Sequence, residues 1–464
     1  MIANIIYWFT QRRWLFFAFL CGLFLFLLPT PEGLTLYGYR SIIIVVVAVL
    51  LIIFEPLPLP AIALLMVIFQ VLFGISSPND AASSFMSDAV FFIMGSLMLA
   101  VAIVHQGLDT RLALGIIRLA GHQTWKIVFG FIAVCAILSS FIGEHTVTAM
   151  MMPVGLTLIR HTNKDPKKVS SLTGLILFSI AYGSAMGSIG TPSGGGRNVI
   201  MIGYLSQFGI ADISYLEWMK YSYPVLLLEI PLAALILWWT FRPEKMTLDS
   251  AVRKLTVQVA KSGKMTGRQI FAIAVFVIVF LGWVFLSPRI GLGIVALIGV
   301  VLYLSFGLVE WQELNRNTNW GVILLFGAAI SIGFQMKETG AALWVATKAI
   351  DTLTLITPDV DMLRGITSVI LTAGLTNLLS NAATVAVIGP IVLNMGGDPV
   401  LIGIATAVAS SFAYLTVVAS PTCMIIHSSG LVTAKDYLRA GWKMFLMSIL
   451  ILFLVSNFWW PLLR

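Results

Sequence analysis

Long apolar segments separated by short polar connections run along almost the whole chain. About 20 consecutive apolar residues suffice for a helix to cross a bilayer, and most of these segments approach that length. About eleven membrane spans are predicted by this criterion, at residues 14–28, 39–54, 57–75, 88–105, 170–208, 222–241, 269–287, 291–309, 320–336, 399–430 and 444–462. Two apolar segments remain, near 127–158 and 366–395, and are predicted as re-entrant hairpins. The pattern therefore predicts an all-α polytopic membrane protein.

Composition agrees with this fold class and leaves little room for a soluble domain. Of the 464 residues, 59% are hydrophobic and only 10% are charged, far outside the range of soluble proteins. Cys21, Cys135 and Cys423 stand apart in apolar sequence, without the spacing of a metal site or of a disulfide framework. No cleavable signal peptide is predicted, because Arg12 and Arg13 lead directly into an apolar span.

Basic residues outnumber acidic ones, and the net charge is +8. With the N-terminus placed inside the cell, most of the 28 Lys and Arg residues fall in inner connections, notably in the segment 242–268. This distribution follows the positive-inside rule and predicts a cytoplasmic N-terminus and an external C-terminus in the plasma membrane. The charge thus orients the protein in the bilayer, and no nucleic-acid partner is expected.

The second half of the chain resembles the first. In each half a long apolar helix runs through a glycine into a shorter amphipathic helix, and a proline-containing hairpin and an interrupted span follow. Three pairs of segments carry this resemblance: 91–114 with 322–345, 143–154 with 380–391, and 181–200 with 407–426. On the predicted topology, the first copy meets the inner side and the second copy the outer side. Inverted repeats are typical of secondary transporters, whose sites lie between the repeats near the midplane.

Each half contains two polar interruptions inside apolar sequence. Residues 140–148 and 377–384 are predicted as hairpin tips, whereas 187–198 and 418–422 are predicted as breaks within spanning helices. Backbone groups freed by a break are tolerated at membrane depth only inside protein or along a wet cavity. Half-helix N-termini favour an anion, while carbonyls and hydroxyls can hold a small cation. The four interruptions are therefore predicted to form one binding site.

The residues at these interruptions resemble those of the divalent anion/sodium symporters, the DASS or INDY-type carriers. The segment SNAATVAVIGP keeps Ser380 and Asn381 of that family's Ser-Asn-Thr motif, and VVASPT stands where the family has a proline-containing break. The phrases NWGVILLFGAAIS and MGSIGTP extend the resemblance over nearly the whole length. It implies a homodimer in which a mobile transport domain moves against a scaffold by an elevator motion. The cargo would be a small divalent anion carried with sodium.

The resemblance also implies a division of the chain. Scaffold helices and a first interfacial helix occupy 1–126. A basic inner linker, further scaffold helices and a second interfacial helix occupy 242–365. The transport domain comprises 127–241 and 366–464, and each of these parts contains a hairpin, a broken helix and a final span.

Candidate substrate-binding residues lie at the tips and breaks. Hydroxyl and amide side chains can hydrogen-bond a carboxylate or a sulfate, and helix capping is the structural alternative for them. The candidates are Glu144, His145, Thr146, Thr191, Arg197, Asn198, Ser380, Asn381, Thr384, Ser420, Pro421 and Thr422. A possible sodium site is expected at Thr376, Ser380, Asn381 and Ala419, with sodium as a coupling ion and no other cofactor.

The first half departs from the family pattern. Gly143, Glu144 and His145 occupy the place of Ser-Asn-Thr, and the following break adds Arg197. An arginine stays protonated and offers a planar fork of donors to a carboxylate. We therefore hypothesise that Glu144 and Arg197 form a salt bridge that supplies the charge of one sodium ion. Two alternatives stay open: Glu144 or His145 carries a coupling proton, or the charges anchor the hairpin outside the substrate site.

Glu229 is a further acid within the predicted span 222–241, close to Pro231. The preferred interpretation is that it bonds to backbone freed by the proline or to a neighbouring helix, and a functional role is the alternative.

The function predicted from these features is secondary active transport of a dicarboxylate or a similar divalent anion. Citrate-like and sulfate-like anions come next, and sodium symport, proton symport and exchange all stay open. An anion channel is a further alternative. An enzyme is not expected, because the chain lacks the HExxH, HxxEH and phosphate-loop spacings.

Overall fold

The computed structural model describes residues 12–54, 56–107, 121–163, 165–260, 265–354, 360–417 and 420–463. Within these ranges the secondary structure is helical, apart from one isolated bridge between Gln123 and Thr247. Eight of the described helices are long and apolar enough to cross a membrane by length and composition. The predicted fold class, an all-α polytopic membrane protein, is confirmed.

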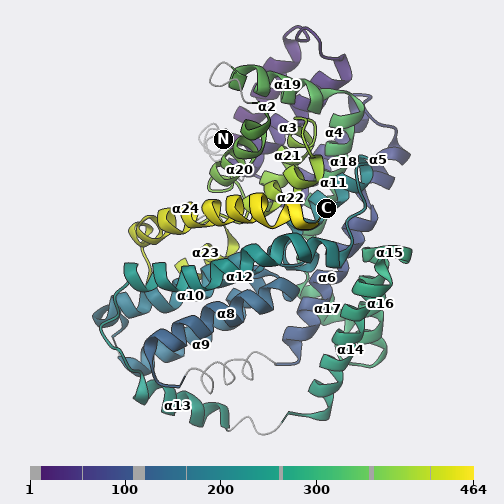
Figure 1. Cartoon of the computed structure of the whole chain (residues 1–464). Coiled ribbons are helices and arrows are strands. Elements are labelled where there is room, and N and C mark those ends of the chain that lie inside the picture. The colour runs from purple at the N-terminus through teal and green to yellow at the C-terminus, as the bar shows by residue number, and fades with distance from the viewer. Residues whose placement is uncertain are drawn as a thin grey trace, which may run out of the picture.

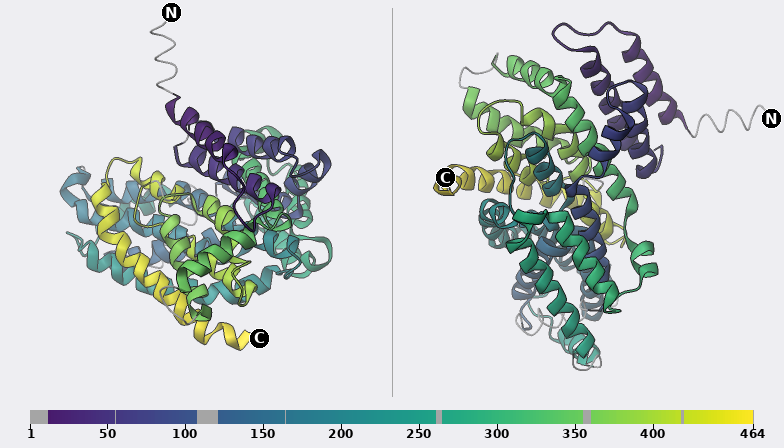
Figure 2. Two further views of the ribbon diagram at one scale, coloured as in Figure 1. Left: turned by 90° about the horizontal axis from the view of Figure 1, so that it is seen from above. Right: turned by 90° about the vertical axis from the view of Figure 1, so that its right-hand side faces the viewer.

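The N-terminal helices form one end of the molecule (Figure 1). They are α2 (Arg13–Leu27), α3 (Leu36–Phe54), α4 (Leu59–Leu72) and the short α5 (Pro78–Phe85). A helix from the second half, α18 (Trp320–Glu338), packs against α3, α4 and α5. Their buried apolar side chains make a separate core around Ile43, Ile62 and Leu325. In both views of Figure 2, the N-terminal helices (purple) lie apart from the C-terminal end of α24 (Ala434–Phe458, yellow).

A second group of helices is built around α6 (Asp88–His105), which packs along α16 (Leu292–Ser305). Gly95 permits this contact, because a Cβ there would lie 2.6 Å from the Cβ of Ala296. The candidate span α14 (Gly267–Phe285) and the short α15 (Ser287–Ile290) pack against α16, and the short α17 (Trp311–Asn317) packs against α6. A fourth helix, α13 (Asp249–Ala260), packs against α9 (Glu144–Thr162). Of these, α13 lies in the basic segment 242–268.

Two helical hairpins lie where the sequence predicts them. The first comprises α8 (Thr124–Ile142) and α9 (Glu144–Thr162), which meet at Gly143. The second comprises α20 (Val360–Leu375) and α21 (Asn381–Val392). The first hairpin is longer than the predicted segment 127–158, because it runs from Thr124 to Thr162. Its first arm, α8, has 19 residues and is one of the eight helices long enough to span a membrane.

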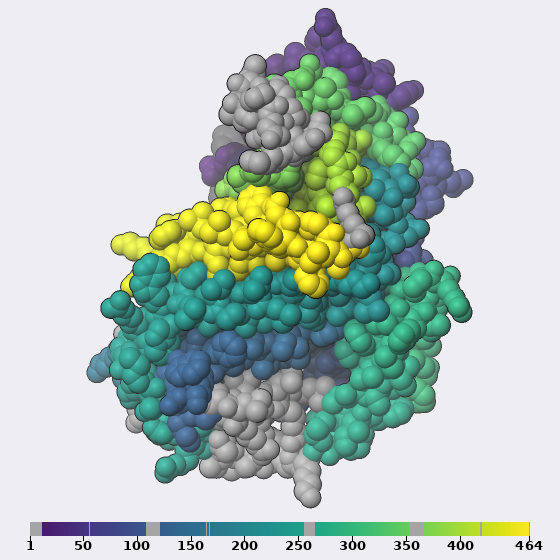
Figure 3. Space-filling view, viewed as in Figure 1, coloured from purple at the N-terminus to yellow at the C-terminus, as the bar shows by residue number. Residues whose placement is uncertain are grey.

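Each hairpin is followed by a broken helix and a long final helix. In the first half these are α10 (Ser170–Gly187), the short η2 (Pro192–Gly194), α11 (Gly196–Gln207) and α12 (Tyr215–Thr240). In the second half they are α22 (Pro399–Ala409), α23 (Pro421–His427) and α24. The helices α12 and α24 pack side by side across the face shown in Figure 3.

The two halves interlock by an exchange of contacts. The second part of each broken helix packs against the second arm of the other half's hairpin: α11 against α21, and α23 against α9. This arrangement brings both tips and both breaks to the boundary between the halves.

Three sequence-based boundaries need correction or fall outside the described residues. The predicted spans 222–241 and 444–462 start too late, because capping boxes at Ser214 and Thr433 begin α12 and α24 earlier. The first interfacial helix would occupy 108–120, which lie outside the described residues. A second shorter helix, α19 (Ala341–Thr354), does follow α18.

Candidate functional site

The first tip is a single-residue turn. Gly143 adopts φ +85°, a conformation that side chains with a Cβ rarely adopt, and it joins the end of α8 to the start of α9. Glu144 is therefore the first residue of α9, and it is buried with 6% of its surface exposed. A carboxylate at this position interacts favourably with the positive end of the helix dipole. The backbone at this tip thus differs from that of the second tip, where Ser380 has φ −64°.

The first break is held together by close backbone packing. A Cβ on Gly187 would lie 2.1 Å from the carbonyl oxygen of Ala136, and one on Gly196 would lie 2.0 Å from the ring of Phe326. The glycines therefore let the break approach α8 and α18, which explains the run TPSGGG without a phosphate ligand. The break ends with Arg197, on the first turn of α11.

The structure places Glu144 and Arg197 in contact. Arg197 Nη1 lies 3.4 Å from Glu144 Oε2 and 3.5 Å from Oε1, and only 2% of the arginine surface is exposed. Ser188, from the end of α10, donates to Glu144 Oε2 at 2.8 Å and also contacts Arg197 Nη2. The two charges are thus paired inside the protein and share a hydroxyl.

The second tip reaches the same carboxylate. Asn381, the first residue of α21, donates from Nδ2 to Glu144 Oε1 at 3.1 Å. In the internal repeat, 143–154 corresponds to 380–391, so Asn381 and Glu144 are equivalent residues that meet each other. Thr376 approaches from the end of α20 and donates to Asn381 Oδ1 at 3.0 Å and to the Ser410 carbonyl at 2.6 Å. The boundary between the repeats therefore passes through this cluster.

One hydrogen bond recurs in both halves and supports the internal repeat. Ser139 donates to the Ser184 carbonyl at 2.6 Å, as Thr376 does to the Ser410 carbonyl. Ser139 and Thr376 are equivalent under the repeat, and so are Ser184 and Ser410. Each bond ties the end of a hairpin helix to the end of the helix before a break, so tip and break form one unit in each half.

Comparisons with known proteins decide the family. The sodium:sulfate symporter transmembrane region matches residues 10–464. The chain belongs to this family. Members of the family are membrane transporters, so the protein is a multi-pass transporter and not an enzyme.

Individual relatives cover most of the chain. The sodium-dependent dicarboxylate transporter SdcS of Staphylococcus saprophyticus is 26% identical over 465 residues, which cover 94% of this chain and 88% of SdcS. The sodium-dependent high-affinity dicarboxylate transporter 3 of Caenorhabditis elegans is 28% identical and covers 83% of this chain and 77% of its own. Among solved structures, the YdaH transporter of Alcanivorax borkumensis matches with a TM-score of 0.56 at 15% identity. That match covers 85% of this chain and 89% of the other, and it shows a shared fold.

Several predicted site residues of this symporter-family chain make hydrogen bonds to the local structure. Thr191 donates to the Ser140 carbonyl and accepts from Tyr215, and Asn198 donates to the carbonyls of Ser188 and Thr191 at 2.8 Å each. Both residues hold the first break in shape. His145 and Thr146 lie partly exposed beside the first tip.

The remaining candidates belong to the second half. Ser380 caps α21 by accepting from the Ala383 amide, and Thr384 donates back to the Ser380 carbonyl at 3.1 Å. Ser420 caps α23, and its hydroxyl lies 2.9 Å from that of Thr422. Pro421 is the first residue of α23, and Ala419 lies outside the described residues. Helix capping, the structural alternative, thus accounts for the contacts of Ser380 and Ser420.

We call the tip and break residues that each half of the chain contributes a half-site, and the two half-sites differ in their fit to sodium. In the second half, three oxygen atoms from Thr376, Asn381 and Ser410 lie together, and hydroxyl, amide and carbonyl oxygens are ligands that suit a hard cation. In the first half, the guanidinium of Arg197 stands against Glu144 and Ser188. The fixed positive charge of Arg197 would repel a sodium ion placed beside it, so the first half does not fit sodium.

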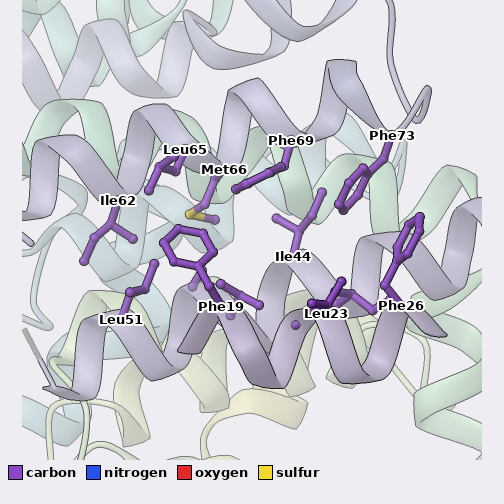
Figure 4. Close-up of a pocket in the computed structure, with 14 residues that line it drawn as sticks. Phe19, Leu23, Phe26, Ile44, Leu51, Ile62, Leu65, Met66, Phe69 and Phe73 are labelled. Carbon is purple, nitrogen blue, oxygen red and sulfur yellow. The ribbon is translucent and has the colours of Figure 1, made fainter. Parts of the chain in front are cut away.

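An apolar cavity elsewhere is unsuitable for an anion. It lies among α2, α3 and α4, has a volume of about 310 Å³ and is lined by apolar side chains that include Phe19, Met66 and Phe69 (Figure 4). None of the lining residues carries a charge or a polar side chain. The polar cluster at the tips is therefore the better candidate for the site.

Sequence reasoning missed Ser188, although it lies in the segment MGSIGTP. Its hydroxyl contacts both members of the ion pair, whereas the sequence shows only a small residue next to a helix break. Ser139 and Ser140 were likewise absent from the predicted set, yet both bond to backbone at the break.

Proposed function

We propose that this protein is a secondary active transporter of small dicarboxylate anions that works by an elevator motion. Its coupling is altered: the Glu144–Arg197 pair takes the place of one sodium ion, and a sodium site at Thr376 and Asn381 is retained. The dicarboxylate transport for which the relatives are named supports the substrate class. The single observation that carries the altered coupling is the contact of Arg197 with Glu144, which is held in turn by Asn381 from the other half.

A fixed pair behaves differently from an exchangeable ion. A bound sodium ion enters and leaves in every cycle, so its gradient can drive transport. Arg197 is part of the chain and cannot be released, so it supplies positive charge without contributing to the driving force. The proposal therefore requires fewer sodium ions per anion than two intact half-sites would use.

The proposal is tested by uptake into proteoliposomes. A panel of succinate, malate, citrate and sulfate would be offered under separate sodium, proton and counter-substrate gradients. We expect a dicarboxylate to be preferred and a sodium gradient to drive its accumulation. Uptake that does not depend on sodium at all, and is driven by counter-substrate or by protons that act through Glu144 or His145, would favour the rival hypothesis. A conductance without saturation would indicate a channel.

Restoring an uncharged first half-site should increase sodium coupling. The double variant Glu144→Asn with Arg197→Ala removes both charges together and restores the amide that Asn381 provides in the other half. We expect more sodium ions to move per anion than in the wild type, measured as the ratio of ²²Na⁺ to labelled substrate. Arg160→Ala, at an exposed arginine on α9, serves as the control. An unchanged ratio in the double variant would argue against the replacement of a sodium ion.

Thr376→Ala should weaken the retained sodium site. It removes one oxygen of the proposed site and leaves Asn381 Oδ1 without its donor. Loss of one such contact is worth about 1.4 kcal/mol, so the sodium concentration for half-maximal uptake should rise about tenfold. Thr406→Ala is the matched control, because that buried hydroxyl donates only within its own helix, to the Ile402 carbonyl. Equal sodium dependence in both variants would exclude Thr376 from the site.

Homodimer formation, the domain division and a cytoplasmic N-terminus stay predictions for this chain. Mass measurement of the purified protein in detergent and labelling of single cysteines near each terminus would check the first and the last.

A further inference from the structure

Glu229 lies near the middle of α12, inside the protein. Its side chain has no exposed surface, and it stands between Pro224 and Pro231. Neither carboxyl oxygen has a hydrogen-bond partner in the described part of the chain. Glu229 makes no hydrogen bond to freed backbone in the described residues, but the neighbouring helix α24 brings the Ser448 hydroxyl beside it, as the second part of the sequence-based interpretation expects. The carbonyl of Lys220, which Pro224 frees, is instead bonded by Trp459 Nε1 at 2.9 Å.

Two other unpartnered hydroxyls lie beside this carboxyl group. The Ser448 hydroxyl, from α24, is next to Glu229, and the Tyr414 hydroxyl comes from the segment between α22 and α23. Within the described residues, both hydroxyls are buried without a hydrogen-bond partner. Three polar groups from three parts of the fold thus meet, and among the described residues none forms a hydrogen bond of good geometry with another.

No positive charge compensates Glu229 among the described residues. The described elements that pack against α12 are chiefly α8, α10, α14, α22, α24 and η2. The titratable group beside Glu229 is Tyr414, which comes from the segment that follows α22. Lys443 of α24 bonds instead to Thr240, about three turns along α12. An ionised carboxylate in such a place is costly, and intramembrane acids are generally kept for a function.

A proton would resolve this arrangement. A carboxylic acid has one O–H donor and keeps acceptor capacity, whereas a carboxylate only accepts. With the proton bound, Glu229 can donate to one neighbouring hydroxyl oxygen and accept from the other. The reaction is the transfer of one proton from hydronium to the carboxylate, which leaves water.

Tyr414 connects Glu229 to the site at the tips. The next residue, Leu415, donates its amide to Asn377 Oδ1 at 2.8 Å, and Asn377 Nδ2 donates to the Phe412 carbonyl at 3.1 Å. Asn377 lies in the second tip, next to the proposed sodium ligand Thr376. The Tyr414 hydroxyl also lies within electrostatic range of the Glu144–Arg197 pair. A short chain of contacts therefore connects Tyr414, and through it Glu229, with the second tip.

We propose that Glu229, Ser448 and Tyr414 form a proton-binding site that adds a proton to the coupling ions. This inference rests on the proposed function as a coupled transporter and names a second coupling ion. The proton would be loaded at Glu229 and carried across with the anion, which replaces the driving force lost with the first sodium site.

The transport test uses Glu229→Gln in proteoliposomes without a sodium gradient. In the wild type, an acidic exterior should drive accumulation of the dicarboxylate at least tenfold above equilibrium. Glu229→Gln should lose this accumulation, because the amide cannot release a proton. The matched control is Glu217→Gln on the same helix, where Gln can keep the capping box at Ser214. Acid-driven accumulation that is the same in Glu229→Gln and in the wild type would overturn the inference.

A second measurement is independent of transport. Infrared spectra of the purified full-length protein report protonated carboxyl groups through their C=O stretch. In the wild type we expect the band of a protonated carboxyl group at neutral pH, and this band should be absent in Glu229→Gln. In Tyr414→Phe the band should remain, but the pH at which it is half lost should shift. Identical bands in all three proteins would overturn the site. If the band behaves as expected but no anion is moved under any gradient, the proposed function fails and the proton site stands.

Discussion

Arg197→Ala is expected to abolish uptake and to lower the free energy of unfolding by about 3–5 kcal/mol, the usual effect of removing one partner of a buried ion pair. The variant leaves the Glu144 carboxylate buried, with only Ser188 and Asn381 as donors. Thermal unfolding in detergent and uptake into proteoliposomes measure the two effects.

The control is a double variant in which both residues of the ion pair are replaced. Glu144→Gln combined with Arg197→Met removes both charges and keeps the volume, so it should recover a large part of the lost stability but not the uptake. Arg160→Ala, at an exposed position, should leave both quantities close to the wild type. If the double variant is as unstable as Arg197→Ala alone, the instability does not come from the unpaired carboxylate.

Gly187→Ala is expected to disrupt the first tip and its break together. The added Cβ would lie 2.1 Å from the Ala136 carbonyl oxygen. Both neighbours are helix backbone, so α8 and α10 could separate only at a cost in free energy. Overpacking of this kind costs about 3 kcal/mol when backbone has to shift. The contact of α10 with α8 would widen, and Ser140 would lose its 2.8 Å bond to the Gly187 carbonyl. We expect reduced yield of folded protein and loss of uptake.

Gly374→Ala is the matched comparison for this prediction. Gly374 lies in α20, in the second hairpin, and a Cβ added there would meet no atom of another described element within 4 Å. Alanine there should stabilise the helix by about 0.5–1 kcal/mol, because it restricts the unfolded chain. Equal melting temperatures of the two alanine variants would show that the close approach at Gly187 does not affect the free energy of unfolding.

Much of the fold could be predicted from the sequence because membrane helices follow from local composition. An apolar segment must satisfy its backbone internally, so its length and flanks determine the helix. Proline and glycine in 187–198 mark the first break for the same local reason. The late start predicted for α12 had a readable cause, since Ser214 and Glu217 form a capping box three residues apart.

The candidate site was only partly predictable. A buried acid at one tip and an arginine at the next break suggest a pair, and the two residues, 53 apart in sequence, are in contact. The sequence does not show that Ser188 contacts both Glu144 and Arg197, or that Thr191 and Asn198 donate to backbone carbonyls at the first break. Those outcomes depend on where the freed carbonyls of the break point.

By itself, the sequence determined the all-α membrane class, the family, the two hairpins and the two breaks. Tertiary structure decided which polar groups meet: Asn381 reaches Glu144 across 237 residues, and Glu229 comes to lie beside the hydroxyls of Ser448 and Tyr414. The physical reason is one of range. Apolar length, glycine and proline act within a few residues, whereas a hydrogen bond or an unpaired charge depends on which distant helices pack together.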